Sequence, residues 1–409
     1  MNFPRIFKPS LLTFSFAVLS SCLSSPSDNT PAVDDSNTLI TNSSSTQYFA
    51  VVSTVEPSFL GGAHSIVELS GNHRAQNDLN PTASSDLNII GRANHIYRIE
   101  KFNADNVTKY NIEAPGIPIW QYSTMDDNDG PSGENISSSN PYSMVFVSNT
   151  KAYILRYGSK RAWIVNPSTQ DESTFKLGEL DLSDYADADG LPEMSYGIIA
   201  NNKLFILMQR LEFWQATQAP YIAVFDLATG NEIDTLQGVG GLKGIELDLR
   251  NPSSKIIYHD GYIYVNGAPD TLWASGIPVG YGAGIQRINV NTYEAEPIIY
   301  SGHNVTSIAV VSSTKAYLTE YAGWDDSSIK SFNPQTGSVN AINVAGIGDS
   351  NDRNISDIVI SPDNKLWIAD SSLNDPGIYI VNTETNSLDA GPVSTNLNPY
   401  NISFCSFSR

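Results

Sequence analysis

A nearly identical segment occurs twice in this chain, and its spacing constrains the fold more than any other feature of the sequence. Val-Ser-Asn-Thr-Lys-Ala-Tyr at 147–153 recurs as Val-Ser-Ser-Thr-Lys-Ala-Tyr at 311–317, and related units surround 203–206, 262–265 and 365–368. Each unit has short β-branched and aromatic runs separated by Gly, Asn, Asp and Pro, which is typical of strands joined by tight turns. A four-stranded unit that recurs about every 50 residues predicts a β-propeller.

The number of units indicates how many blades the propeller has. Complete units begin near Leu87, Pro141, Ser195, Lys255, Thr306 and Ser356, and an incomplete unit without an inner strand begins at Gln47. Asn-Pro-Tyr-Asn-Ile-Ser-Phe at 398–404 resembles the expected inner strand Asn-Pro-Tyr-Ser-Met-Val-Phe at 140–146. We therefore expect an all-β propeller of seven four-stranded blades, with six or eight left open. The C-terminal strand should complete the first blade and leave no open edge.

The same motifs place the chain beside a known group of propellers. The Asn140-Pro141-Tyr142 start, the strand at 151–153 and the turn at 226–230 resemble the YncE-like, surface-layer (YVTN-type) seven-bladed propellers, over nearly all of residues 47–409. The resemblance implies the fold and says little about function. Some propeller lipoproteins of this general kind capture cobalamin for a TonB-dependent transporter. No residue of this chain matches their ligand contacts, so the resemblance implies only a class of ligand or partner.

The N-terminal residues have the pattern of an export signal. Arg5 and Lys8 precede a short apolar run at 11–19, which is too short to span a bilayer. Leu19-Ser20-Ser21-Cys22 resembles the lipobox of bacterial lipoproteins, so we expect a signal peptide at 1–21 and a lipid on Cys22. The alternative is an ordinary signal peptide with a chance cysteine. No Asp follows Cys22, which favours the outer membrane and leaves its periplasmic and cell-surface sides open.

Composition constrains the rest of the chain beyond the signal peptide. Residues 23–46 are mostly Ser, Thr, Asn, Asp and Pro, which predicts a flexible tether at 22–46 before the propeller at 47–409. The formal net charge is −20, and −22 once Arg5 and Lys8 are removed, which argues against nucleic acid as a partner. The only other cysteine in the sequence is Cys22, which we expect to carry the lipid. Cys405 therefore has no disulfide partner, and we expect it to be buried and inert.

Loop lengths predict which face of the propeller binds a ligand or partner. Loops between first and second strands are short, whereas those at 54–63, 209–220, 267–284 and 320–328 are long, and long loops on a rigid scaffold commonly bind ligands. Aromatic and arginine residues are frequent at binding surfaces. The expected ligand or partner face consists of Arg156, Arg210, Phe213, Trp214, Trp273, Tyr281, Glu320 and Trp324. The alternative is that each aromatic residue packs its own loop onto its blade.

Two acidic segments are candidates for a metal site. The segments 126–130 and 184–193 both combine carboxylates with turn residues, as calcium sites do, although neither has EF-hand spacing. Asp187, Asp189 and Glu193 are the best candidates, with simple polar turns as the alternative. No Gly-x-Ser-x-Gly elbow, phosphate-binding loop or histidine set with metal-ligand spacing occurs.

These observations favour a binding function. We expect an outer-membrane lipoprotein whose loop-rich face captures a small molecule or docks a partner protein such as an uptake transporter. A calcium-assisted lactonase-type hydrolase and a structural envelope protein are the alternatives, and calcium is the only cofactor that the sequence suggests.

Overall fold

The computed structural model describes residues 46–127, 129–131, 137–342, 347 and 353–408. The expected signal peptide, Cys22 and nearly all of the tether lie outside these residues. Within them the chain forms 27 β-strands and three single-turn 3-10 helices, namely η1 (Glu172–Thr174), η2 (Ser183–Tyr185) and η3 (Pro269–Thr271). None of the helices in this part of the chain is long and apolar enough to cross a bilayer.

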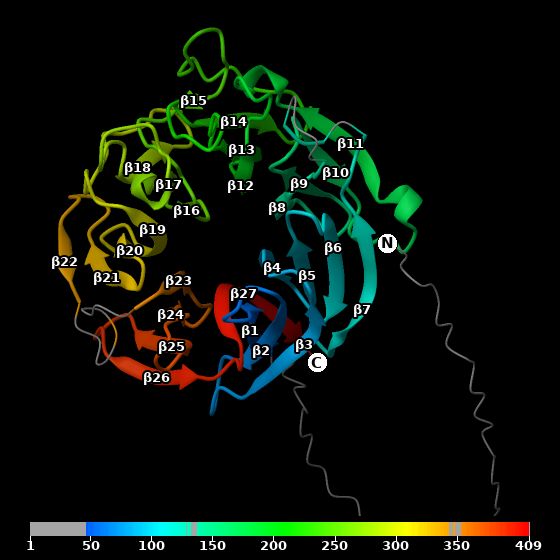
Figure 1. The fold of residues 1–409 in the computed structure, drawn as a ribbon, viewed down its shortest axis with the longest axis vertical. Coiled ribbons are helices and arrows are strands. Elements are labelled where there is room, and N and C mark those ends of the chain that lie inside the picture. Colours follow the sequence, from blue (N-terminus) through cyan, green and yellow to red (C-terminus); the bar gives the residue numbers. More distant parts are fainter. Residues whose placement is uncertain (1–45, 128, 132–136, 343–346, 348–352, 409) are drawn as a thin grey trace, which may run out of the picture. The chain divides into compact units, whose positions relative to one another are not determined.

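The strands form seven antiparallel sheets arranged as the blades of a ring (Figure 1). The predicted seven-bladed propeller is therefore confirmed. In order from the inner to the outer strand, blade 1 is β27 (Asn398–Ser408), β1 (Thr46–Val55), β2 (Gly62–Glu68) and β3 (Ala75–Thr82). Blade 2 is β4 (Leu87–Arg92), β5 (His95–Glu100), β6 (Asn106–Asn111) and β7 (Ala114–Ser123). Blade 3 is β8 (Pro141–Phe146), β9 (Ala152–Arg156), β10 (Arg161–Val165) and β11 (Lys176–Asp181).

The remaining blades follow in chain order around the ring. Blade 4 is β12 (Met194–Ala200), β13 (Lys203–Met208), β14 (Tyr221–Asp226) and β15 (Ile245–Glu246), and blade 5 is β16 (Ile257–His259), β17 (Tyr262–Gly267) and β18 (Gly284–Asn289). Blade 6 is β19 (Val305–Ser312), β20 (Lys315–Gly323), β21 (Asp326–Phe332) and β22 (Val339–Ala341). Blade 7 is β23 (Ile355–Ile360), β24 (Lys365–Asp370), β25 (Gly377–Asn382) and β26 (Leu388–Val393).

The outer position of blade 5 is irregular. In place of a fourth strand, single bridges join Ile285 to Ile299 and Ile288 to Ala295. Pro297 lies between these two bridges and has no N–H to donate to a ladder, which explains why the pairing is interrupted there.

Side chains that point alternately to the two faces of each strand form the core between the blades. In β13, Leu204 and Ile206 face blade 3, whereas Phe205 and Leu207 face blade 5, because successive side chains of a strand point to opposite faces. Seven clusters of buried apolar residues occur in the described chain, one between each pair of neighbouring blades. Each blade is therefore apolar on both faces and depends on both neighbours.

The C-terminal strand closes the ring as expected. β27 is the inner strand of blade 1 and pairs with β1 from Thr46↔Ser408 to Val55↔Asn398 (Figure 1). Cys405 is buried at this closure, and burial raises the pKa of its thiol to about 12, so the thiol stays protonated. Its predicted burial is confirmed.

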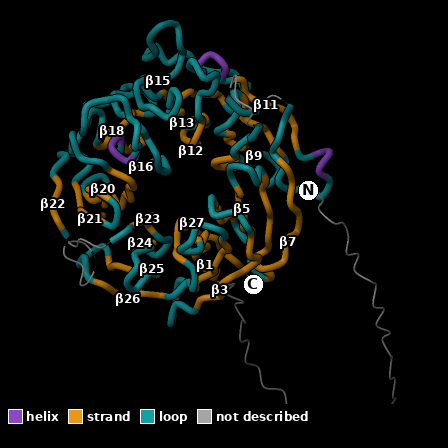
Figure 2. Tube along the Cα trace, in the orientation of Figure 1, coloured by secondary structure: helices purple, strands orange, loops and turns teal. Residues whose placement is uncertain are grey.

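One expected long loop is a hairpin. The sequence pattern predicts a loop at 320–328, but β20 and β21 continue through this segment with the pairs Glu320↔Ser328, Tyr321↔Ser327 and Gly323↔Asp326. Asp325 turns the chain with a φ of 55°. The loops at 56–61, 209–220 and 268–283 remain long, and Figure 2 shows the last of them near β18, where it contains η3.

Candidate functional site

The aromatic residues expected on the binding face are exposed, but they belong to three separate blades. Trp273 has 96% of its surface exposed and Trp214 has 63%, and Phe213, Tyr281 and Trp324 are also exposed. Phe213 and Trp214 lie in the blade 4 loop, and these two line a cavity. The structure therefore brings two of the five aromatic candidates into one site.

Arg156 lies beneath this face rather than on it. Its side chain is completely buried and ion-paired with Asp129, and its Nε donates to the backbone oxygen of Thr124 at 2.9 Å. The guanidinium also lies 4.5 Å from the ring centroid of Trp163. Through these contacts Arg156 stabilises the connection between blades 2 and 3.

Arg210 and Glu320 are also engaged by their own blades. Arg210 donates to the backbone oxygens of Tyr185 and Ala219 at 3.0 and 3.1 Å, and so ties down the blade 4 loop. Burial by itself would raise the pKa of Glu320, but hydrogen bonds from Lys330, His303 and Tyr300 lower it below its ordinary value.

The three carboxylates proposed as metal ligands do come together. Asp187, Asp189 and Glu193 each offer an oxygen such that all three oxygens lie within 4.8 Å of one another. Calcium binds oxygens at about 2.3–2.6 Å, so two of its ligands are separated by at most about 5 Å. The spacing of the three carboxylates therefore fits one calcium ion. We call this group the carboxylate triad.

Backbone amides fix the carboxylate triad in place. Asp189 accepts from the backbone N–H of Leu191 at 3.0 Å and of Phe213 at 3.2 Å, and Glu193 accepts from Leu211 at 3.0 Å. Oδ2 of Asp187 is enclosed and has no hydrogen-bond partner among the described residues. An enclosed carboxylate oxygen without a donor is costly unless the carboxyl is protonated or lies beside a cation.

The backbone around the triad is strained. Glu193, Arg210, Phe213 and Trp214 all adopt left-handed conformations, with φ of 48°, 52°, 49° and 63°. Such a conformation is uncommon for residues of this size, and it tends to occur where the surrounding structure serves a ligand site.

Electrostatics of the triad favour bound protons or a bound cation. Burial raises the pKa of Asp187 to about 7, and the negative charge of the neighbouring Asp189 adds to the effect. Burial also raises the pKa of Glu193 well above its ordinary value, and Asp187 and Asp189 contribute. A cation among these oxygens would compete with those protons.

Two members of the triad, Asp189 and Glu193, line a small cavity of about 160 Å³. Tyr157, Phe213 and Trp214 also line it. This volume is below the roughly 300 Å³ at which drug-sized ligand pockets begin. The cavity is therefore smaller than a pocket for a drug-sized ligand.

An aromatic row leads from this cavity toward the centre of the ring. Trp214 stacks on Tyr157 with ring centroids 6.4 Å apart, Tyr157 stacks on Tyr142 at 5.0 Å, and Tyr142 meets the edge of Tyr196 at 5.5 Å. None of these three tyrosines is among the residues expected from the sequence. The sequence signal that could have identified them is their position. Two lie near the starts of inner strands and one lies at the end of β9, all on the loop-rich face.

The acidic segment that begins at Asp126 is paired with basic side chains. Asp129 is paired with Arg156, and Asp126 accepts from Lys176 at 2.6 Å and from Nε1 of Trp163 at 3.2 Å. These side chains neutralise the two carboxylates, so the segment forms an ion-pair network, in contrast to the carboxylate triad.

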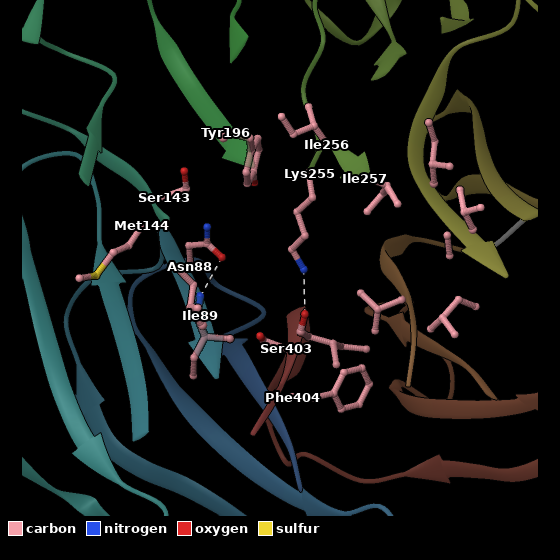
Figure 3. A pocket seen from close by; sticks show the side chains of 18 residues that line it. Asn88, Ile89, Ser143, Met144, Tyr196, Lys255, Ile256, Ile257, Ser403 and Phe404 are labelled. Carbon is pink, nitrogen blue, oxygen red and sulfur yellow. Dashed lines mark hydrogen bonds between the residues drawn. The ribbon is translucent and has the colours of Figure 1, made fainter. Parts of the chain in front are cut away.

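The central channel is largely apolar. A cavity of about 420 Å³ is lined by inner-strand side chains from all seven blades, including Ile89, Met144 and Phe404 (Figure 3). Lys255 extends into it and donates to the backbone oxygen of Ile402 at 2.8 Å (Figure 3). The channel itself offers few polar groups for chemistry.

Comparison with known proteins supports the fold. No family model and no curated protein sequence matches this chain. A Bacteroides uniformis protein provisionally named a 6-phosphogluconolactonase superposes with a TM-score of 0.54 at 11% identity, over 88% of this chain and 99% of that chain. Apo AztD from Citrobacter koseri superposes with a TM-score of 0.50 at 13% identity, over 89% and 99%. At such identities the likeness concerns the propeller fold alone.

Proposed function

We propose that this protein is a binding lipoprotein that captures a small ligand on the loop-rich face, with a calcium ion held by the carboxylate triad. The observation that carries the proposal is that three buried or half-buried carboxylates converge beside a cavity walled by Trp214, Phe213 and Tyr157. Calcium takes six to eight oxygen ligands, so the triad would leave several positions for water or ligand oxygens.

The anchor and the partner belong to the same proposal. The lipobox supports lipidation at Cys22 and an outer-membrane location, and the tether would hold the binding face near an uptake transporter. Trp273, Tyr281 and Trp324 lie outside the small cavity and remain candidates for contact with such a partner.

We expect calcium to bind the purified propeller and to raise its melting temperature. At a calcium concentration 100 times Kd, binding stabilises the folded state by about 2.7 kcal/mol. The double variant Asp189→Asn/Glu193→Gln should lose this shift, because amides supply fewer and uncharged ligand oxygens. Calorimetric titration and thermal unfolding with calcium and magnesium measure both effects.

The matched control is Asp184→Asn, which removes an exposed carboxylate from the same segment outside the triad. It should bind calcium as the unaltered protein does. Equal calcium binding in the control and the double variant would exclude the triad as the site.

Calcium affinity should increase with pH up to about 7 and then level off. Asp187 has a pKa of about 7 in the folded protein, so protons compete with calcium below that value. Without calcium, the protonated Asp187 stabilises the fold at low pH, and this contribution is lost as pH rises from 3.8 to about 7. Calcium titrations between pH 5 and 8 measure the dependence, and Asp187→Asn should reduce it.

Trp214 should report the binding event by its fluorescence. Its indole borders the same cavity as Asp189 and Glu193, so an added ion changes its electrostatic surroundings. A calcium-dependent change in emission is expected in the unaltered protein and in Trp273→Phe, but not in Trp214→Phe. Loss of the signal in Trp273→Phe alone would move the site to the blade 5 loop.

A calcium-assisted hydrolase is the second candidate. Carboxylates with raised pKa in a cavity are frequent among catalytic acids and bases, and one structural neighbour is provisionally named a lactonase. Calcium-dependent turnover of lactones that is abolished by Glu193→Gln would favour this candidate over capture.

A further inference from the structure

A second and larger hollow lies over the channel, separate from the carboxylate triad. Its volume is about 480 Å³, and we call it the vestibule. Tyr196 and Lys255 line both the vestibule and the channel cavity, so the two hollows adjoin at these residues. The vestibule is within the size range of small-molecule sites.

The charges of the vestibule floor are largely compensated within the protein. Lys255 is ion-paired with the buried Asp357, and Lys101 is paired with Asp86 at 2.8 Å. Glu56 and Asp325 are the other carboxylates of the lining. The floor therefore does not present a strong field of either sign, which argues against a highly charged ligand.

Six neutral side chains of the vestibule have polar groups without a partner. The hydroxyls of Tyr142, Tyr196 and Tyr400 and the side-chain amides of Asn354, Asn398 and Asn401 make no hydrogen bond with any described residue. Asn251 differs from these residues, because its side-chain amide donates to Ala268 and Thr271. A set of converging free hydroxyls and amides provides donors and acceptors to a ligand rich in hydroxyl groups.

Aromatic surfaces accompany these polar groups. Phe59 and Trp324 of the lining are exposed, and Tyr142 and Tyr196 meet edge to face with centroids 5.5 Å apart. Aromatic faces pack well against the apolar C–H faces of sugar rings, while their polar ends and neighbouring amides meet the hydroxyls.

We propose that the vestibule is a binding site for a small neutral carbohydrate of one or two rings. The free hydroxyls and amides recognise its hydroxyl groups, and Trp324 and Phe59 cover its apolar faces. This site is independent of the carboxylate triad, which lies under the blade 4 loop.

The test is saturation-transfer NMR of the propeller with a panel of mono- and disaccharides (glucose, galactose, mannose, xylose, maltose, cellobiose and lactose), followed by calorimetry on the binders. The variants Asn354→Ala, Asn401→Ala and Tyr196→Phe should each weaken binding of the best sugar about tenfold or more. Asn340→Ala, which alters an exposed amide on β22, should bind it unchanged.

The double variant Asp189→Asn/Glu193→Gln separates the two proposals. This variant should bind the sugar normally even though it no longer binds calcium. If the unaltered protein does not bind calcium, the sugar test can still be carried out and interpreted. Absence of any saccharide binding at about 10 mM, a concentration well above the millimolar Kd of weak ligands, would overturn the inference. Sugar affinities unchanged in all three vestibule variants, or preference for benzoate over every sugar, would also overturn it.

Discussion

Truncating the chain after Leu397 is expected to abolish the folded ring. The deletion removes β27, and with it the ladder along β1 and the buried side chains of Ile402 and Cys405. It also removes contacts to three other blades, because β27 receives hydrogen bonds from Gly91, Lys255 and Ser356. The total stability of a domain is about 5–15 kcal/mol, and the loss of an entire inner strand exceeds it.

Near-ultraviolet circular dichroism, limited proteolysis and thermal unfolding measure this outcome. A truncation after Phe407 is the matched control, since it removes only the pair Thr46↔Ser408 and should fold normally. A peptide spanning 398–408, added to the longer truncation, should restore the fold by pairing with β1. A longer truncation that melts cooperatively at the unaltered temperature would show that blade 1 does not need its inner strand.

Arg156→Met is expected to destabilise the protein by about 3–5 kcal/mol, because removing one partner of a buried ion pair leaves the other charge uncompensated. The remaining charge is that of Asp129, which is also buried. Arg161→Ala should change stability by only about 0–1 kcal/mol, since its partners Glu179 and Asp181 and Arg161 itself are partly exposed. Denaturant unfolding of both variants measures the difference.

The double variant Arg156→Met/Asp129→Asn tests the mechanism. It should recover much of the lost stability, because no buried charge then lacks a partner. If Arg156→Met instead kept full stability and lost ligand binding, Arg156 would belong to the ligand face that the sequence suggested.

The repeat pattern was sufficient to predict the architecture. The expected units at Leu87 and Pro141 coincide with the starts of β4 and β8, because turn residues mark where each strand begins. Closure by the last strand was also predictable, since its Asn-Pro-Tyr start repeats that of an inner strand. The hairpin at 320–328 was missed because Gly323, Asp325 and Asp326 are typical of loops, yet the first and last of them still pair.

The site was only partly predictable. Asp187, Asp189 and Glu193 lie within seven residues, so one turn sufficed to bring them together. Their contact with Phe213 depends on how the blade 4 loop folds back, which local sequence does not specify. Arg156 was expected on the ligand face because arginine is frequent at binding surfaces, but whether its side chain points inward is set by the neighbouring connection.

The pairing of β1 with β27 also determines the order in which the domain can mature. Phe49 and Cys405 are partners although 356 residues separate them, so β1 cannot pair with its inner neighbour until the C-terminal end of the chain is made. Until it forms, Val51 and Val52 of β1 lack one neighbouring strand. A chain synthesised from its N-terminus would therefore expose this unpaired apolar edge until its last residues are made. Such an edge can pair with other chains, so the last strand protects the domain from aggregation as well as completing the ring.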